Sequence, residues 1–424
     1  MNIDRTRLNV VLRAIVVGLL VGIVVSAFRW AIGQLLEVWK VIYHTSAQNH
    51  WLMLVVILGM VGLAWIIGKI TGPNPNVMGS GIPQVEGQLH GQIEMNAWSV
   101  LWRKFVAGIL AIGTGTFLGR EGPSIQLGAA VGQLYAEKRH FKQQNRSLMI
   151  ATGAAAGLAA AFSAPIAGTM FVLEEIYRSF SVLVWLGALT GALTADLVAQ
   201  EIFGLTPVLA IHYTHVLPLH YYWILVILGL VLGLAGYCYQ RVILWMPRFY
   251  QLFSRIPREF QGVVPLLLVI PVGIYFSNTL GGGATLIQSV AKSVPGLGIL
   301  VGLLLLRFVF SMISYGSGLP GGIFLPILTL GALIGAIVGM VFVKMGLLPN
   351  VYIPNLIIFA MAGYFAGISK APFTAIILIT EMVGSLMHLL PLALVALVAY
   401  LVVDLLGGTP IYESLLARLQ LTKR

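Results

Sequence analysis

The sequence contains few charged residues and almost no cysteine. Only 9% of its 424 residues are Asp, Glu, Lys or Arg, whereas soluble domains carry about 25%. Its one cysteine, Cys238, excludes an intramolecular disulfide and a metal site built from several cysteines. Because 58% of the residues are hydrophobic, the composition excludes an ordinary soluble domain and indicates a polytopic membrane protein.

Apolar segments recur from one end of the chain to the other. They occupy residues 8–31, 51–70, 98–118, 148–173, 181–200, 222–246, 263–276, 297–313, 322–345, 355–380 and 387–406. Several exceed the roughly 20 residues that a helix needs to span a bilayer, and several are shorter. We therefore expect an all-helical membrane protein in which some helices are partial or re-entrant. The first apolar run lacks a small-residue cleavage site, so no signal peptide is expected.

The net charge of +11 comes largely from basic residues that cluster at the ends of the chain and in or next to the connections between the apolar segments. The basic clusters fall within residues 5–13, 138–146, 241–258 and 418–424. Cytoplasmic connections of membrane proteins are rich in Lys and Arg, so these segments and both termini are predicted to face the cytoplasm. The connections at 41–50 and 205–221 contain no Lys or Arg and are predicted to lie outside. Nucleic-acid binding is therefore a poor explanation of the charge.

The two halves of the chain share an internal repeat. The matched segments are PSIQLGAAVG at 123–132 with PILTLGALIG at 326–335, and GLAAAFSAP at 157–165 with GYFAGISKAP at 363–372. The Ala-Pro pairs lead on to Glu174 in the first half and to Glu381 in the second. Paired elements in the same order predict one transmembrane domain made of two repeats, about 8–205 and 220–410, with no soluble regulatory domain.

Four Gly-rich breaks interrupt the apolar segments, at residues 79–83, 119–123, 316–326 and 407–412. A glycine beside a helix start frees backbone N–H groups, and the helix dipole adds partial positive charge there, so such starts bind anions. Each break alone is better explained by close helix packing. The hydroxyl groups of Ser80 and Tyr412 lie in two of the breaks, and the four breaks together favour a site for a small anion.

One break contains an acid, Glu121, flanked by Gly119, Arg120, Gly122 and Pro123. Burying a carboxylate in a membrane protein is costly unless the charge is paired or lines a wet cavity. Pairing with Arg120 is not the simplest explanation, because adjacent helical residues do not face each other. We interpret Glu121 as a gate that repels an anion when ionised and admits it when protonated, and hence as a proton carrier.

A second pair of acids, Glu174 and Glu175, closes an apolar run. Two interpretations remain open. The pair is either a solvated helix end that interacts with Arg178 or a second proton station on the cytoplasmic side. In the second interpretation, Glu86 and Lys104 are expected to form a buried ion pair that supports the station.

Motifs of enzymes and of metal sites are missing. The chain has no H-E-x-x-H, no G-x-S-x-G and no P-loop, so a membrane hydrolase has no support and no enzymatic activity is expected. His212, His215 and His220 fall in a predicted external loop without acids nearby, which argues against a metal site. No cofactor is expected.

The ordered breaks resemble those of the CLC family of chloride channels and chloride/proton exchangers. GSGIP at 79–83, GREGP at 119–123, GIFLP at 322–326 and the late Tyr412 match the filter motifs of that family in order. The resemblance implies an inverted-repeat fold of about 18 helices. It also implies a homodimer with one pore per subunit, located in the plasma membrane as in bacterial-type members.

The resemblance also implies roles for individual residues. The chloride ligands would be the hydroxyl groups of Ser80 and Tyr412 and the backbone N–H groups of Ile323 and Phe324. Glu121 would be the external gating glutamate, and Glu175 would pass protons to the cytoplasm. Since channels of the family commonly have an apolar residue in place of that second acid, the chain is expected to exchange chloride for protons. A passive chloride channel on the same fold is the alternative.

Overall fold

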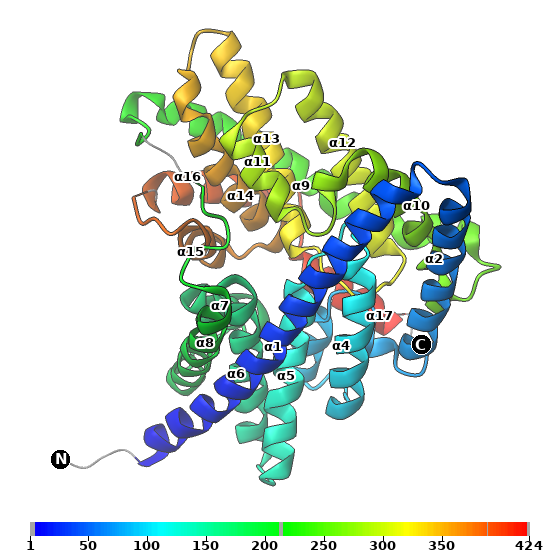
Figure 1. Ribbon diagram of the computed structural model, residues 1–424. Coiled ribbons are helices and arrows are strands. Elements are labelled where there is room, and N and C mark those ends of the chain that lie inside the picture. Colours follow the sequence, from blue (N-terminus) through cyan, green and yellow to red (C-terminus); the bar gives the residue numbers. More distant parts are fainter. Residues whose placement is uncertain (1–4, 212–214, 388, 422–424) are drawn as a thin grey trace.

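The computed structural model describes residues 5–211, 215–387 and 389–421, and 17 α-helices form this part of the chain (Figure 1). The first half contains α1 (Arg5–Ser46), α2 (His50–Thr71), α3 (Ile82–Leu89), α4 (Ala97–Gly113), α5 (Glu121–Lys138), α6 (Gln143–Phe162), α7 (Pro165–Phe171) and α8 (Val182–Phe203). The second half contains α9 (Tyr222–Tyr250), α10 (Val263–Tyr275), α11 (Ala284–Lys292), α12 (Leu297–Gly316), α13 (Phe324–Lys344), α14 (Ile353–Ser369), α15 (Pro372–Val383), α16 (Leu389–Leu405) and α17 (Ile411–Leu421).

The helices differ greatly in length, as the apolar segments predict. Eight helical segments of the described chain are long and apolar enough to cross a membrane. Others are too short to cross, such as α3 with 8 residues and α7 with 7. The prediction of an all-helical membrane protein with partial helices is confirmed, and the described chain has 17 helices against the approximate expectation of 18.

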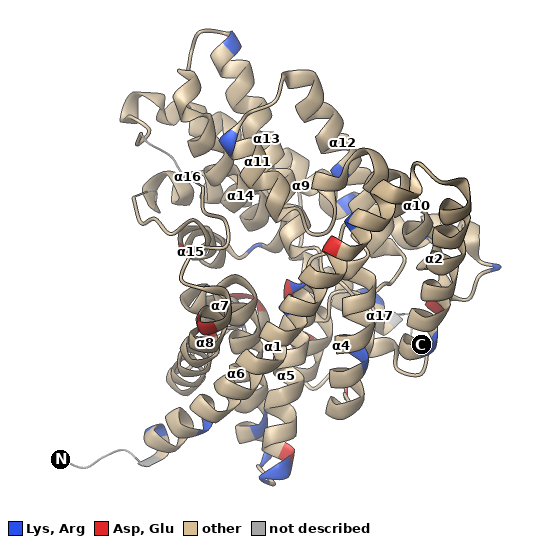
Figure 2. Cartoon of the chain, viewed as in Figure 1, with Lys and Arg blue, Asp and Glu red and all other residues tan. Residues whose placement is uncertain are grey.

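The outer surface is apolar where a soluble protein would be polar. On α2 the exposed fractions of Val55, Leu58 and Trp65 are 63%, 62% and 57%. In Figure 2 most of the ribbon carries no charge, and Lys and Arg gather at places such as the far end of α5. An apolar outside over long helices is the arrangement that a lipid environment favours, because lipid does not penalise exposed apolar side chains.

The glycines of the repeated segments bring helices into close contact. A Cβ atom at Gly128 of α5 would lie 2.1 Å from the carbonyl oxygen of Gly153 of α6. In the second half, a Cβ atom at Gly335 of α13 would lie 2.5 Å from the carbonyl oxygen of Leu356 of α14. At these positions glycine is required for packing, which places α5 against α6 and α13 against α14.

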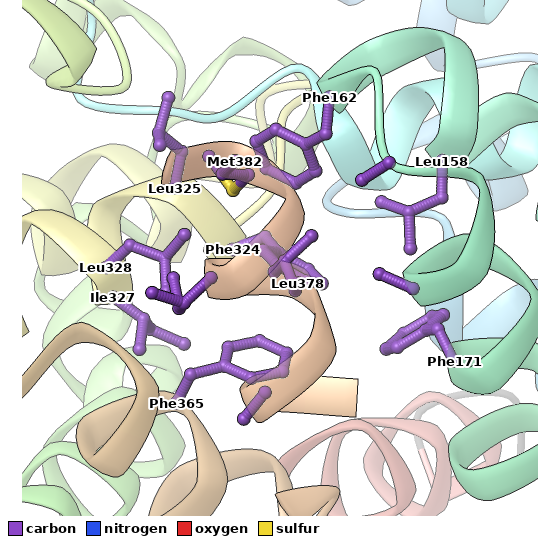
Figure 3. Packing of buried hydrophobic residues seen from close by; sticks show 14 of the residues in the cluster. Leu158, Phe162, Phe171, Phe324, Leu325, Ile327, Leu328, Phe365, Leu378 and Met382 are labelled. Atoms are coloured by element: carbon purple, nitrogen blue, oxygen red, sulfur yellow. The ribbon is translucent and has the colours of Figure 1, made fainter. Parts of the chain in front are cut away.

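An aromatic core surrounds the start of α13 (Figure 3). The ring centroid of Phe324 lies 4.2 Å from that of Phe365, 5.4 Å from that of Phe162 and 5.8 Å from that of Phe171. Phe324 is fully buried. Contacts between aromatic rings from α6, α7 and α14 therefore fix the first residue of α13, whose backbone belongs to one of the Gly-rich breaks.

Candidate functional site

Two of the Gly-rich breaks are joined to each other by backbone hydrogen bonds. The N–H of Gly119 donates to the carbonyl of Gly322, and the N–H of Gly322 donates to the carbonyl of Gly119, both at 2.7 Å. α5 and α13 each begin two residues after the bridged glycine. The bridge therefore holds two helix N-termini side by side, although the residues are about half a chain apart in sequence.

The break before α3 joins the same arrangement. The N–H of Gly79 donates to the carbonyl of Gly318 at 3.2 Å, and the N–H of Gly321 donates to the carbonyl of Gly79 at 3.0 Å. Three N-termini, those of α3, α5 and α13, thus converge on one region. The first N–H groups of a helix lack partners within it, so this region is rich in available donors and in partial positive charge.

The prediction that Lys104 pairs with Glu86 is wrong. The Lys104 Nζ donates to the carbonyl oxygens of Val77 at 2.9 Å and Gly79 at 2.6 Å, and the side chain is completely buried. Lys104 points into the loop before α3, whereas Glu86 lies further along α3 and forms an ion pair with Arg178. The cation at position 104 therefore supports the backbone on which Ser80 is carried.

Arg307 of α12 supports a loop of the second half in the same way, and this role was not predicted from the sequence. Its NH1 donates to the carbonyl oxygens of Thr279 at 2.7 Å and Gly281 at 2.8 Å, and it is also completely buried. The signal for it was present, since Arg307 is the only charged residue in the apolar segment 297–313. A buried cation bonded to several carbonyl groups orders a loop that has no regular structure of its own.

The hydroxyl groups of Ser80 and Tyr412 are both buried, and neither has a hydrogen-bond partner among the described residues. Ser80 lies against the start of α5, because a Cβ atom at Gly122 would be 2.2 Å from its Oγ. The Tyr412 ring contacts Phe171, with centroids 6.1 Å apart, and Phe171 contacts Phe324. Buried hydroxyl groups are almost always bonded, so two unpartnered ones mark a place for a ligand.

The structure brings the predicted anion ligands to the same set of helix starts. Phe324 is the first residue of α13 and Ile323 is its N-cap residue. Their N–H groups are among those that an α-helix leaves unbonded within itself. The site therefore combines neutral donors and helix dipoles, and such groups suit a small anion that must bind and leave.

Glu121 is the first residue of α5 and is completely buried. None of the described side chains, Arg120 included, donates a hydrogen bond to its carboxylate, which faces the backbone N–H groups of Glu121 and Leu325. A Cβ atom at Gly119 would be 2.2 Å from the Glu121 Oε2 and 3.3 Å from the backbone nitrogen of Leu325. The carboxylate therefore lies between the starts of α5 and α13, where the helix dipoles favour negative charge.

The two neighbouring acids, Glu174 and Glu175, have different surroundings. The Glu174 carboxylate accepts hydrogen bonds from the backbone N–H of Phe373 at 3.1 Å and of Thr374 at 2.7 Å, at the start of α15. The alternative in which it pairs with Arg178 is wrong, because Arg178 forms ion pairs with Glu86 and Glu413. The Glu174 carboxylate therefore caps the N-terminus of α15.

Glu175 lies in a single π-helical turn, η2 (Val172–Ile176), and is only 2% exposed. Its Oε1 has no hydrogen-bond partner among the described residues. A surface groove of about 550 Å³ ends beside it and is lined by polar groups that include Glu174, Arg178 and Lys370. A buried, unpartnered carboxyl group next to an open groove is placed to exchange protons with water.

The histidines of the connection between α8 and α9 are only partly described. His212 lies outside the described residues. The ring of His215 is 6.5 Å from that of Tyr352, and the ring of His220 is 4.1 Å from that of Tyr221, centroid to centroid. Within the described ranges, no three His, Cys, Asp or Glu side chains are grouped closely enough to hold a metal ion.

Known proteins resemble the chain over nearly its whole length. A family model described as "Voltage gated chloride channel" matches residues 59–404. The H(+)/Cl(-) exchange transporter ClcA of Vibrio cholerae is 34% identical, over 98% of this chain and 90% of its own. The protein of the same name from Salmonella paratyphi B is 32% identical, over 99% of this chain and 90% of its own.

Solved structures also resemble this chain over nearly its whole length. The crystal structure of a slow cyanobacterial Cl−/H+ antiporter has a TM-score of 0.90 and 31% identity, covering 96% of this chain and 97% of that one. A CLC-type fluoride/proton antiporter has a TM-score of 0.75, covering 95% and 96%. Since its identity is only 22%, that second likeness concerns the fold alone.

Proposed function

The chain belongs to the CLC family of voltage-gated chloride channels and their relatives, and from this membership we propose that it exchanges chloride for protons across a membrane. The observation that carries the proposal is the pair of buried, unpartnered hydroxyl groups on Ser80 and Tyr412. Ser80 lies against the start of α5, and Tyr412 contacts Phe171, which packs against Phe324 at the start of α13. The two ClcA relatives are named H(+)/Cl(-) exchange transporters, and the solved structure at 31% identity is that of a Cl−/H+ antiporter. Exchange is therefore better supported than passive conduction, and nothing favours the hydrolase alternative.

Chloride would bind with four donors from this chain. The hydroxyl groups of Ser80 and Tyr412 would donate to it, together with the backbone N–H groups of Ile323 and Phe324. All four residues are buried, which strengthens hydrogen bonds to an anion because no water competes for them. Neutral donors hold chloride weakly enough to let it pass, which a buried Lys or Arg in the same place would not.

Glu121 would act as the gate and as the first proton carrier. Its carboxylate occupies the space between the two helix starts, which is also where an anion is favoured. The ionised carboxylate and chloride therefore compete for the same electrostatic environment. Protonation removes the charge, so Glu121 leaves the path and chloride enters. Glu121 therefore takes up a proton when its carboxylate leaves the path and gives the proton up when it returns.

Glu175 would pass the proton between Glu121 and the cytoplasm. It is the buried acid beside the groove, whereas its neighbour Glu174 is engaged in capping α15. No side-chain hydrogen bond among the described residues joins Glu121 to Glu175. The proton would travel between them through water that enters transiently, since a proton needs a continuous chain of hydrogen bonds.

We also propose that the two halves, about 8–205 and 220–410, are inverted repeats within one transmembrane domain. Two kinds of contact in the second half have a counterpart in the first: backbone hydrogen bonds between loops, and buried cations bonded to carbonyl groups. The N–H of Gly79 bonds to the carbonyl of Gly318, and the N–H of Gly281 bonds to the carbonyl of Gly115. The buried cations Lys104 and Arg307 each bond to carbonyl groups just before a short helix. A two-fold relation between the halves explains both correspondences.

The protein is a multi-pass membrane protein, and its finer placement is part of the proposal. The Lys- and Arg-rich connections support cytoplasmic termini, and the bacterial exchangers support a bacterial plasma membrane. The partners would be chloride, protons, the lipid bilayer and a second copy of the chain, each copy with its own pore. No cofactor, metal ion or nucleic acid is required by this mechanism.

Purified protein in lipid vesicles provides the test. With a chloride gradient imposed and no other driving force, antiport moves protons uphill in exchange for chloride, and an external pH electrode records the movement. A potassium ionophore sets the membrane potential so that passive proton leak is known. Chloride flux without uphill proton movement would show a channel and would sink the antiport proposal.

A further inference from the structure

Arg178 joins three segments of the chain, its own turn and two distant helices, through one guanidinium group. Its NH2 lies 3.0 Å from the Glu86 Oε1, and its NH1 lies 2.7 Å from the Glu413 Oε2. Its Nε donates to the backbone carbonyl of Glu175 at 3.2 Å. Arg178 itself has a φ of 50°, a left-handed conformation that side-chain-bearing residues adopt rarely. The strained backbone and the three contacts together show that the side chain is held in a defined position.

The three segments are those that carry the inner residues of the proposed transport path. Glu86 lies on α3, which begins two residues after Ser80. Glu413 directly follows Tyr412 at the start of α17. The third contact is the backbone of Glu175 itself. Arg178 therefore connects the helices of both chloride-binding hydroxyl groups to the proton-transfer glutamate.

The two ion pairs differ in their exposure to solvent. The Glu86 side chain is 3% exposed, whereas that of Glu413 is 50% exposed, and Arg178 lies between them at 34%. A buried ion pair is hard to break, because loss of one partner leaves an uncompensated charge. An exposed pair is weak and is easily broken and remade. The contact with α3 is therefore harder to break than the contact with α17.

Arginine is the residue that this geometry requires. Its planar fork directs N–H groups at two carboxylates on different helices while a third N–H reaches a backbone carbonyl. A lysine ammonium group has the same charge but concentrates it at one point. The shape of the guanidinium group, as well as its charge, is what joins α3, α17 and η2.

We propose that Arg178 is a positioning residue that couples the proton-transfer turn of Glu175 to the inner end of the chloride path at Ser80 and Tyr412. The inference rests on the proposed antiport and adds the element that keeps its two fluxes in a fixed ratio. When α17 moves to release chloride, the Glu413 contact opens while the Glu86 and Glu175 contacts persist. Displacement of Tyr412 and exposure of Glu175 to the groove are thereby linked events.

The experiment compares Arg178→Gln with the wild type in lipid vesicles and measures the number of chloride ions moved per proton. Wild-type exchange establishes the antiport independently. We expect Arg178→Gln to keep at least half of the chloride turnover while the chloride-to-proton ratio rises threefold or more. Arg178→Lys restores the charge without the fork and should give an intermediate ratio. Arg248→Gln, at an exposed arginine on α9, is the matched control and should keep the wild-type ratio.

Glu413→Gln isolates the exposed contact. It should raise the ratio by a smaller factor than Arg178→Gln, and the double variant Arg178→Gln/Glu413→Gln should behave as Arg178→Gln alone, because both changes remove the same contact. If Arg178→Gln does not yield folded protein, Glu413→Gln decides the question, since its side chain is half exposed.

Two results would overturn the inference while leaving the antiport intact. One is an unchanged ratio in Arg178→Gln, or in Glu413→Gln where that variant decides. The other is an equal loss of chloride and proton flux, which would show that Arg178 merely supports the fold. If the wild type moves no protons uphill, the proposed function itself has failed.

Discussion

Glu174 and Glu381 each cap a helix that begins in the other half of the chain. The Glu174 carboxylate accepts hydrogen bonds from the first turn of α15, at Phe373 and Thr374. The Glu381 carboxylate, on α15, accepts them from the first turn of α7, at Ile166 with 3.0 Å and Ala167 with 2.8 Å. A carboxylate at a helix N-terminus satisfies unbonded N–H groups and is favoured by the dipole. These two reciprocal caps tie the two halves of the chain together.

Glu121→Gln is expected to abolish proton transport and to make chloride flux independent of pH. In the wild type, protonation of Glu121 admits chloride, so chloride flux rises as the pH falls. Glutamine resembles the protonated acid at every pH and removes that dependence. The measurement is the rate of chloride efflux from vesicles over a range of about three pH units, from roughly pH 4.5 to 7.5, which covers the ordinary pKa of a glutamate and values above it. If a steep pH dependence persists in the variant, the gate lies elsewhere.

Glu175→Gln is expected to abolish proton transport while chloride flux continues. The amide has nearly the same shape as the acid but cannot accept and release a proton, so only the proton route is interrupted. Proton and chloride movements are recorded in the same vesicles. Coupled transport in this variant would show that Glu175 has been assigned the wrong role.

Glu174→Ala is expected to lower stability and leave the coupling intact. Its carboxylate caps α15, and loss of a cap costs about 0.5–2 kcal/mol. Thermal unfolding in detergent should therefore occur at a lower temperature than in the wild type. The chloride-to-proton ratio in vesicles should equal that of the wild type, which contrasts this acid with its neighbour Glu175. A changed ratio would mean that Glu174 takes part in proton transfer.

Tyr412→Phe is expected to weaken chloride binding by roughly tenfold or more, because a hydrogen bond to a charged group contributes about 1.5–3 kcal/mol. The ring contact with Phe171 is retained, so the fold should not change. Titration calorimetry with chloride measures the effect. Tyr275→Phe, at a side chain that is 77% exposed, is the control and should bind chloride as the wild type does. Equal affinities in the two variants would remove Tyr412 from the site.

The sequence alone was enough to predict the class of fold, and it singled out the residues of the candidate site. The length of each apolar segment indicates whether its helix is long enough to cross a membrane or is only partial. This information is local, because each helix meets lipid along its own length. The Gly-rich breaks, the unusual acid Glu121 and the hydroxyl groups of Ser80 and Tyr412 are equally visible in the sequence, since each departs from its apolar surroundings.

Only the tertiary structure decided which polar side chain faces which partner. Lys104 binds carbonyl groups instead of Glu86, Glu174 caps a helix about 200 residues away, and Arg178 joins Glu86 to Glu413. A charged residue in a sequence shows that a partner is needed, because an unpaired charge is costly in the protein interior. The identity of that partner depends on how distant helices pack, and helix packing follows from the shapes of all the contacting side chains together.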